Sequence, residues 1–452
     1  MSQTTPAARP AGETPLAPVY PFNSPSAPIC LYDGPIGGFA ATPWSGTVEL
    51  DCLAGRGLTW RIEHEDYACL NLEGPASLRL KRYGIEQIVE GQRGAYTFTT
   101  GAGAVSTGWI NTAVLGRPDA SLDRVLVHWL NLPQITGSVP LVESNEAGEH
   151  SRLGRWCTDV DGWRLKLDIR PDYSDAMAAA DTGRLYVITH VMEIRRADGG
   201  SFDTASAEGL IECLRLSFSF AFGRWVAPAL PVGFDVADEI VWEQWTSPIC
   251  DAAKSIGHAW LYKSRTDDLA ELLRCTVPNF VAQGEGGLTR FQMILAVQAV
   301  ESGFVEQRIL AAAPALESLT WANLVLAKGI TKTSFERMIA EDKLRLLLRE
   351  ANISSEIDAT HLPALARLAR SENIDGPTAV TRVRNRLVHP TDPQGQIYRH
   401  DGLVRDAWLL GLNYTTLLIL HSIGYKGSYG DLTHLTRGAG EASSVPWAIG
   451  SN

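Results

Sequence analysis

The hydrophobic pattern of this 452-residue chain changes its period near residue 250. Before that point, short stretches alternate apolar and polar residues and end at Gly, Pro or Asp, which is typical of β-strands. Such stretches lie at 47–50, 58–62, 78–81, 125–129 and 163–167. After it, apolar residues recur at the spacing of amphipathic helices. The change predicts two domains of different class, and the chain is also too long for one ordinary core.

The sequence therefore predicts an α+β protein in three parts. Residues 1–28 are rich in Pro, Ala, Ser and Thr with Arg9 as their one basic group, so a disordered leader is expected there. Residues 29–250 are expected to form a β-rich sandwich or barrel-like domain. Residues 251–452 are expected to form an all-α, up-and-down helical bundle.

Within these parts, five local predictions can be tested directly. Helices are expected at 174–180 and 205–216, and the stretch 217–226, which begins with the alternating residues Ser-Phe-Ser-Phe-Ala-Phe, predicts a strand after the second one. In the helical part, Pro314 predicts a kink or break within 304–328. The periodicity of 335–350 predicts one continuous helix.

Cysteine usage and hydropathy point to a cytoplasmic chain. The seven cysteines are scattered and odd in number, and no pair has C-x2-C spacing, which argues against a disulfide framework and a cysteine-based zinc site. The first 28 residues have no apolar core of a secretory signal. The apolar run at 407–424 is interrupted by polar residues, so a buried helix is expected and no membrane association.

The net negative charge of the chain comes entirely from residues 1–250. The net charge is −11, but Lys plus Arg balances Asp plus Glu from residue 251 onward. Within this neutral part, basic residues cluster between 367 and 389, and this cluster is the predicted anion-binding surface. Its arginines are Arg367, Arg370, Arg382, Arg384 and Arg386.

The cluster contains the motif Arg384-Asn385-Arg386-Leu387-Val388-His389-Pro390. On a helix, Asn385 and His389 are four residues apart and share a face. A residue before proline disfavours the α conformation, so the helix is expected to end at or just before His389. Arginine for charge, histidine for proton transfer and an amide that holds one of them in place are groups that can act on a phosphodiester.

Late in an all-α region, this motif resembles that of the HEPN superfamily, and in particular ApeA-like HEPN proteins with a β-rich N-terminal domain. The resemblance covers about 250–430, and Ala315-Leu316-Glu317-Ser318-Leu319 is similar to the acid-bearing helix of such bundles. It implies a metal-independent, cofactor-free endoribonuclease with a toxin-like role in stress or anti-phage defence. The β-rich domain would then be a sensor whose trigger the sequence does not identify.

The resemblance also implies roles for single residues. His389 would act as general acid or base on the ribose 2′-hydroxyl and the leaving 5′-oxygen, Arg384 would stabilise the transition state, and Asn385 would orient one of them. Arg382 and Arg386 would add RNA contacts, and Glu317 would orient Arg384. Because Arg384 and His389 are about 140° apart around a helix, the motif is interpreted as half of a site that a second copy completes in a homodimer.

Three alternatives remain open on sequence grounds. The bundle could be a non-catalytic HEPN-like module for dimerisation, RNA binding or adaptor function. A carbohydrate site could use Trp156, Asp159, Asp161 and Trp163, although a hairpin turn at 159–162 explains this pattern better. A metal could bind at His64 with Glu63, Glu65 and Asp66, although side chains alternate between the faces of a strand, which favours a solvated edge.

The remaining histidines of the helical part carry no metal prediction. His361, His400, His421 and His434 are interpreted as lacking a metal-type partner at i,i+3 or i,i+4 spacing, so surface or core roles are expected.

Overall fold

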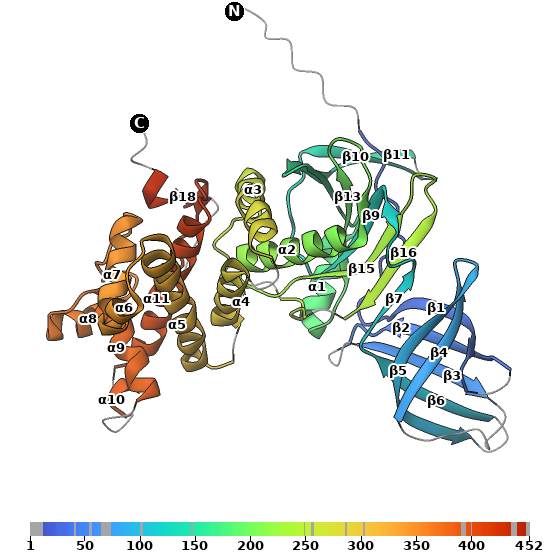
Figure 1. Ribbon diagram of the computed structural model, residues 1–452, viewed down its shortest axis with the longest axis horizontal. Helices are drawn as coiled ribbons and strands as arrows, with labels where there is room; N and C mark the ends of the chain where they lie inside the picture. The colour runs from blue at the N-terminus through green and yellow to red at the C-terminus, as the bar shows by residue number, and fades with distance from the viewer. Residues whose placement is uncertain are drawn as a thin grey trace, which may run out of the picture. The chain divides into compact units, whose positions relative to one another are not determined.

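The computed structural model divides the chain into two units (Figure 1). Unit 1 comprises residues 1–211 and 226–255, and unit 2 comprises 212–225 and 256–452. The structure describes residues 12–39, 42–53, 57–64, 74–99, 103–145, 148–247, 249–254, 257–284, 287–301, 303–389, 395–398, 400–434 and 441–448. Unit 1 is rich in strands and unit 2 in helices, so the predicted mixed α+β class is confirmed.

The first six strands of unit 1 form a closed antiparallel barrel in the order β1-β2-β3-β6-β5-β4. They are β1 (Ile29–Gly37), β2 (Trp44–Leu50), β3 (Leu58–His64), β4 (Gly74–Arg82), β5 (Ile85–Thr99) and β6 (Gly103–Ile110). The predicted alternation is visible in β4, where Ala76, Leu78 and Leu80 are buried and the residues between them are exposed. Closure leaves the barrel without free edge strands.

The rest of unit 1 is built on an eight-stranded sheet in the order β10-β11-β12-β13-β9-β15-β16-β7. These strands are β7 (Thr112–Gly116), β9 (Arg124–Leu130), β10 (Val139–Asn145), β11 (Gly148–Val160), β12 (Trp163–Ile169), β13 (Ile188–Arg196), β15 (Ala227–Phe234) and β16 (Ile240–Thr246). Short strands β8 (Ser121–Leu122) and β14 (Phe202–Asp203) pair separately. The predicted single β-rich domain thus contains a barrel and a second sheet.

The hairpin between β11 and β12 settles the carbohydrate alternative. Asp161 and Gly162 form its turn with φ values of 46° and 74°, as a type I′ turn requires. Asp159 forms an ion pair with Arg164 across the hairpin at 2.9 Å. Trp156 and Trp163 are 4% and 6% exposed, so they do not form an open aromatic platform for a sugar. The hairpin prediction is confirmed.

Part of the predicted leader is packed against unit 1. Residues 1–11 lie outside the described residues, but Glu13 pairs with Leu141 of β10, and the backbone N–H of Leu16 donates to Asp168 at 2.7 Å. Tyr20 and Asn23 are both buried. The structure therefore differs from the prediction for 12–28. The composition of residues 1–28 suggested disorder. Composition is an average over the segment, so it does not reveal that a few of its side chains, such as Tyr20 and Asn23, become buried and anchor it.

The predicted strand at 217–226 is wrong: residues 217–222 continue helix α2 (Thr204–Phe222), residues 223–226 connect the elements, and β15 begins only at Ala227. The preceding helix α1 (Tyr173–Gly183) and the start of α2 lie where the sequence predicts them. Alternation failed as a signal because the serines at 217 and 219 are as completely buried as the phenylalanines between them. When every side of a segment is buried, the period of its polarity no longer reports its backbone conformation.

Unit 2 consists mainly of helices. They are α3 (Thr266–Gln283), α4 (Leu288–Glu301), α5 (Val305–Trp321), the π-helical turn η1 (Ala322–Ala327), α6 (Lys332–Arg337), α7 (Ala340–Glu350), α8 (Pro363–Glu372), α9 (Gly376–Val388), α10 (Gly395–Tyr398) and α11 (Leu403–Ser422). A short β17–β18 pair (Ser428–Tyr429 and Ser443–Ser444) and the 3₁₀ turn η2 (Pro446–Ala448) follow.

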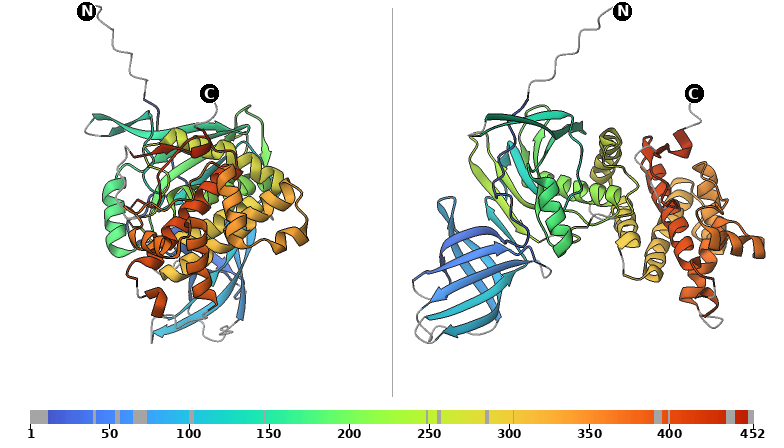
Figure 2. Two further views of the ribbon diagram at one scale, coloured as in Figure 1. Left: turned by 90° about the vertical axis from the view of Figure 1, so that its left-hand side faces the viewer. Right: turned by 180° about the vertical axis from the view of Figure 1, so that it is seen from behind.

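Helix α11 is the core of unit 2. Nearly all of its residues are buried, and it packs against α4, α5, α8 and α9 (Figures 1 and 2). The segment 305–327 and α11 are both long and apolar enough to cross a membrane by length and composition. The buried position of α11 confirms the expected core helix at 407–424.

Two helix predictions differ from the structure. The break predicted as one outcome at Pro314 is absent, because helix α5 continues through this residue, and its packing against α4 and α11 explains why the lost backbone hydrogen bond is tolerated. The predicted helix at 335–350 is divided into α6 and α7, because Met338 and Ile339 adopt extended conformations with ψ of 135° and 152°.

Candidate functional site

The motif lies on α9, whose two ends are defined by particular residues. Asp375 is the N-cap, and its Oδ1 accepts from the backbone N–H of Thr378 at 3.1 Å. Pro377 occupies the first turn, where a proline needs no backbone donor. The helix ends at Val388, and His389 leaves helical geometry with φ −123° and ψ 81°. The predicted end at His389 is confirmed, while Pro390 lies outside the described residues.

The N-cap also joins α9 to α7. Arg345 of α7 donates to both carboxylate oxygens of Asp375, at 2.5 and 3.0 Å. Burial alone would raise the pKa of Asp375, but the hydrogen bonds from Arg345 and Thr378 outweigh it and lower the pKa to about 2. The ionised carboxylate therefore stabilises both the start of α9 and its packing on α7.

We expect Asp375 to make unit 2 sensitive to acid. Because its folded pKa lies below the ordinary value of 3.8, its contribution is complete above that value and is lost as the pH falls toward about 2. The contribution amounts to roughly 2 kcal/mol. Chemical denaturation between about pH 5 and about pH 2 measures it. Asp375→Asn keeps a good N-cap but should remove most of this pH dependence; an unchanged slope would contradict the assignment.

A cavity of about 360 Å³ opens beside the motif. Its walls come from α5, α7, α9 and α11, and most of its lining is apolar. Arg384 and Thr381 of α9 and Glu317 and Thr320 of α5 bring polar groups to it, and Trp408 of α11 lies among its apolar residues. The indole Nε1 of Trp408 donates to the carbonyl of Ala299 at 2.7 Å, which fixes the ring in place.

Arg384 is the motif residue that reaches this cavity. Its Nη1 donates to Oδ1 of Asn385 at 2.8 Å, and among the described residues it forms no ion pair with a carboxylate. Asn385 and His389 are exposed on the last turn of α9 and at its end. Arg384 therefore keeps its charge available for an anion, while His389 is accessible to solvent.

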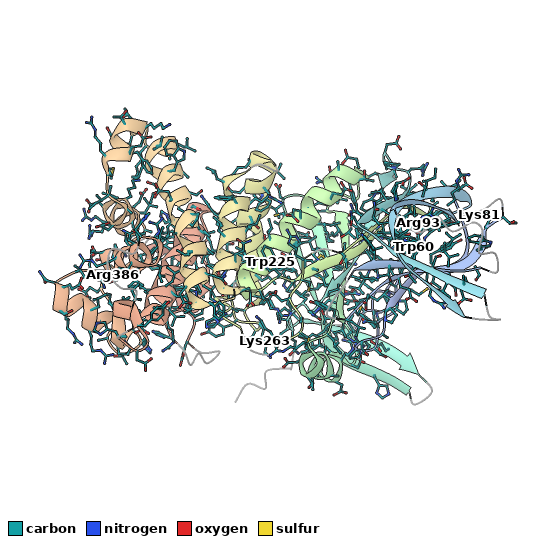
Figure 3. All side chains as sticks on the ribbon, turned by 90° about the horizontal axis from the view of Figure 1, so that it is seen from below. Trp60, Lys81, Arg93, Trp225, Lys263 and Arg386 are labelled. Atoms are coloured by element: carbon teal, nitrogen blue, oxygen red, sulfur yellow. The ribbon has the colours of Figure 1, made fainter. Side chains whose placement is uncertain are left out.

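The neighbouring arginines form ion pairs within unit 2. Arg382 and Arg386 both form ion pairs with Glu372 at the end of α8, the latter at 3.3 Å (Figure 3, where Arg386 is labelled). They are four residues apart, so one carboxylate can pair with both. These contacts fasten α9 to α8 and neutralise part of the basic cluster from which RNA contacts were predicted.

Glu317 is not the partner of Arg384 that the sequence suggested. Although both line the cavity, Glu317 forms an ion pair with Lys343 of α7 at 3.0 Å. The side chain of Lys343 is only 9% exposed, and its ammonium also lies 3.7 Å from the ring centroid of Phe335. A buried cation needs a counter-charge, and this requirement explains the pairing of Glu317.

The metal cluster considered near His64 is only partly within the described residues. Glu65 and Asp66 lie outside them, and Glu63 forms an ion pair with Arg61 on β3. Glu63 is therefore paired with an arginine of its own strand.

Sequence reasoning missed the residues that determine which charged groups near the cavity are paired. Glu372 and Lys343 carry no motif, and their roles depend on helices α7 and α8 packing beside α5 and α9. The available signal was the acidic residue Glu372 within a basic cluster, since a lone carboxylate among arginines is expected to pair with some of them.

Comparison with known proteins adds the following. Residues 117–256 match the model of the YopA central domain, and residues 293–443, which contain α9 and the whole motif, match that of the YopA C-terminal domain. The SPbeta prophage-derived uncharacterized protein YopA of Bacillus subtilis strain 168 is 30% identical over 314 residues, which is 68% of this chain and 68% of that protein. No solved structure matches the chain significantly.

Proposed function

The chain belongs to the YopA family, and we propose that it is a metal-independent endoribonuclease whose site is built on α9. One observation carries this proposal. Of the three arginines in the last turns of α9, Arg382 and Arg386 are paired with Glu372, whereas Arg384 has no carboxylate partner among the described residues and borders a cavity. An unneutralised arginine five residues from an exposed histidine supplies a charge for the transition state and a group for proton transfer, as RNA cleavage by general acid–base chemistry uses them.

The proposed reaction needs only these side chains. His389 removes the proton of a ribose 2′-hydroxyl, whose oxygen attacks the adjacent phosphorus and displaces the 5′-oxygen of the next nucleotide. The leaving oxygen takes a proton from an imidazolium, so the products are a 2′,3′-cyclic phosphate and a 5′-hydroxyl. Arg384 stabilises the extra negative charge on the phosphoryl oxygens, and the bond from Arg384 to Asn385 supports Asn385 as its orienting residue.

A second copy of the chain is part of the proposal. On a regular helix Arg384 and His389 would be about 140° apart, and His389 lies after the last residue of α9, so the proposal does not require one chain to direct both side chains at the same phosphate. A two-fold pair of unit 2 would place Arg384 of one copy opposite His389 of the other. Each dimer would then hold two equivalent sites.

The proposed biological role is stress or anti-phage defence. The relative in Bacillus subtilis is described as prophage-derived, which supports a function in conflict between phages and their host. Unit 1 would act as the sensor, since its barrel and sheet contain none of the proposed catalytic residues. Its trigger is left open by the proposal.

A non-catalytic adaptor is the second candidate, and the cavity favours it. The lining is mostly apolar, with Ile309, Leu316, Leu344 and Trp408 among its members. Such a surface suits a small apolar ligand or the side chains of a partner protein better than a phosphate. In that case Arg384 would contact the partner and His389 would have no chemical role.

The test uses the full-length chain and RNA in the presence of a chelator. Cleavage into fragments with 2′,3′-cyclic phosphate ends is expected, and a 2′-deoxy nucleotide at the cleaved position should block it. Far-UV circular dichroism of the chelator-treated chain verifies that it stays folded. RNA that stays intact in vitro and in cells expressing the chain, together with wild-type RNA binding by His389→Ala, would favour the adaptor.

A further inference from the structure

Three potential metal ligands meet in unit 2 outside the cavity. Asp358 and His361 belong to the connection between α7 and α8, and His434 follows β17. Their ligand atoms all lie within 4.8 Å of one another, so the expectation that His361 and His434 have no metal-type partner is wrong. The rings of His361 and His434 face each other, with centroids 3.7 Å apart and an angle of 27° between their planes. Two segments far apart in the sequence thus bring two imidazoles and a carboxylate together.

The distances fit ligands of a shared ion better than a hydrogen-bonded group. Nε2 of His361 is 3.9 Å from Oδ2 of Asp358, which is too long for a hydrogen bond. The other oxygen, Oδ1, already accepts from the backbone N–H of Thr360 at 2.7 Å, so Oδ2 is the oxygen that faces the histidine. With metal–ligand bonds of about 2.0–2.1 Å, two ligands of a tetrahedral zinc ion are separated by about 3.4 Å. Small side-chain rotations would bring the three groups onto one ion.

We propose that Asp358, His361 and His434 bind a zinc ion, with water as the fourth ligand, and that the ion fastens the segment after β17 to the α7–α8 connection. The donor set selects the ion, because imidazole nitrogen suits zinc and related transition metals. Calcium and magnesium prefer sites made of oxygen ligands alone.

The backbone on both sides of the site is held by other contacts. The backbone N–H of Leu362 donates to the carbonyl of Asp358 at 2.9 Å, and that of Leu432 donates to the side chain of Asn413 on α11 at 3.2 Å. The ligands therefore start from positions near those that the ion requires. Such preorganisation lowers the conformational entropy lost on binding.

This inference is independent of the proposed ribonuclease. The three ligands share no residue with the cavity or with the motif on α9. The ion is assigned a structural role, so its loss is expected to change the stability of unit 2 and not the chemistry at His389. Metal binding and RNA cleavage can accordingly succeed or fail separately.

The test is a titration of the full-length, chelator-treated chain with zinc alone, by isothermal calorimetry. One ion per chain is expected, and His361→Ala, His434→Ala and Asp358→Asn should each weaken binding by roughly 10- to 100-fold or more. His150→Ala, an exposed histidine on β11, is the matched control and should bind as the wild type does. Zinc should also raise the thermal unfolding midpoint of the wild type but not of the three variants.

Two controls establish whether the zinc ligands are the three named side chains. Cobalt(II) in place of zinc distinguishes nitrogen and oxygen ligands from cysteine thiolates by its visible spectrum. Asp358→Asn retains the shape of the side chain and an acceptor for Thr360, so it reports ligation even where a histidine variant folds poorly. Absence of stoichiometric binding, a thiolate spectrum, or equal affinity in the wild type and Asp358→Asn overturns the proposal.

Discussion

Replacing His389 by alanine is expected to lower the rate of RNA cleavage by roughly 10²–10⁴-fold, the usual contribution of a general acid or base. The exposed position of His389 after the end of α9 means that the substitution removes the imidazole without disturbing a core. The fold should therefore be unchanged, and single-turnover cleavage of a labelled RNA at saturating enzyme measures the chemical step alone.

The same helix offers a matched control for Arg384. Arg384→Ala should also lose cleavage, and Arg384→Lys should restore only part of it, because lysine lacks the planar fork of the guanidinium. Arg382→Ala removes an arginine that is paired with Glu372, so it should affect the stability of unit 2 more than the rate. Equal loss of rate in Arg382→Ala and Arg384→Ala would show that the helix contributes charge without a specific site.

Mixing two inactive variants tests the composite site. In a mixed dimer of Arg384→Ala and His389→Ala chains, one of the two sites would still receive an intact arginine from one copy and an intact histidine from the other. Partial activity is therefore expected after mixing and subunit exchange. If the mixture is as inactive as its components while the wild type is active, each site lies within one chain and the dimer proposal is wrong.

The second large effect is expected in unit 1, where Arg155→Ala should destabilise the fold by about 3–5 kcal/mol. The side chain of Arg155 is 3% exposed and donates to both oxygens of Asp168, each at 2.7 Å. Asp168 and Glu13 raise the pKa of Arg155 further above its ordinary value, so the guanidinium is always charged. Its removal would leave the carboxylate of Asp168, which is 5% exposed, without a counter-charge.

The loss should be visible in residues 12–28 before the whole unit unfolds. Arg155 also pairs with Glu13 and donates to the carbonyl of Thr14 at 3.0 Å, and the N–H of Leu16 donates to Asp168. Hydrogen–deuterium exchange should therefore accelerate in 12–28 of Arg155→Ala. Chemical denaturation gives the accompanying change in the free energy of unfolding.

Two further variants separate burial from charge. Arg155→Met combined with Asp168→Leu replaces the whole pair by apolar side chains and should recover most of the stability lost in Arg155→Ala. Arg164→Ala removes an exposed pair in the same sheet, with side chains 49% and 54% exposed, and should destabilise the fold far less than Arg155→Ala does. A similar loss in Arg155→Ala and Arg164→Ala would contradict the importance of burial.

Local patterns predicted much of the fold where one face of a segment meets solvent. The alternation in β4 and the helical spacing of α4 and α9 report a buried and an exposed side, and the structure has those elements. The same reasoning failed at 217–222, where all sides are buried, and at 335–350, where two extended residues divide a uniform pattern. Periodicity carries information only while the two faces of a segment differ.

In the candidate site, too, some features follow from local sequence and others only from tertiary contacts. That α9 starts at Asp375 and ends at His389 follows from capping and proline rules that act within a few residues, and the sequence alone determined it. The tertiary structure decided which arginine stays unpaired, because Glu372 on α8 pairs with Arg382 and Arg386. It also decided that His361 meets His434, because the chain returns toward the α7–α8 connection after α11. Charge pairing and metal ligation act between side chains that the sequence separates, so only the tertiary structure brings their distances within range.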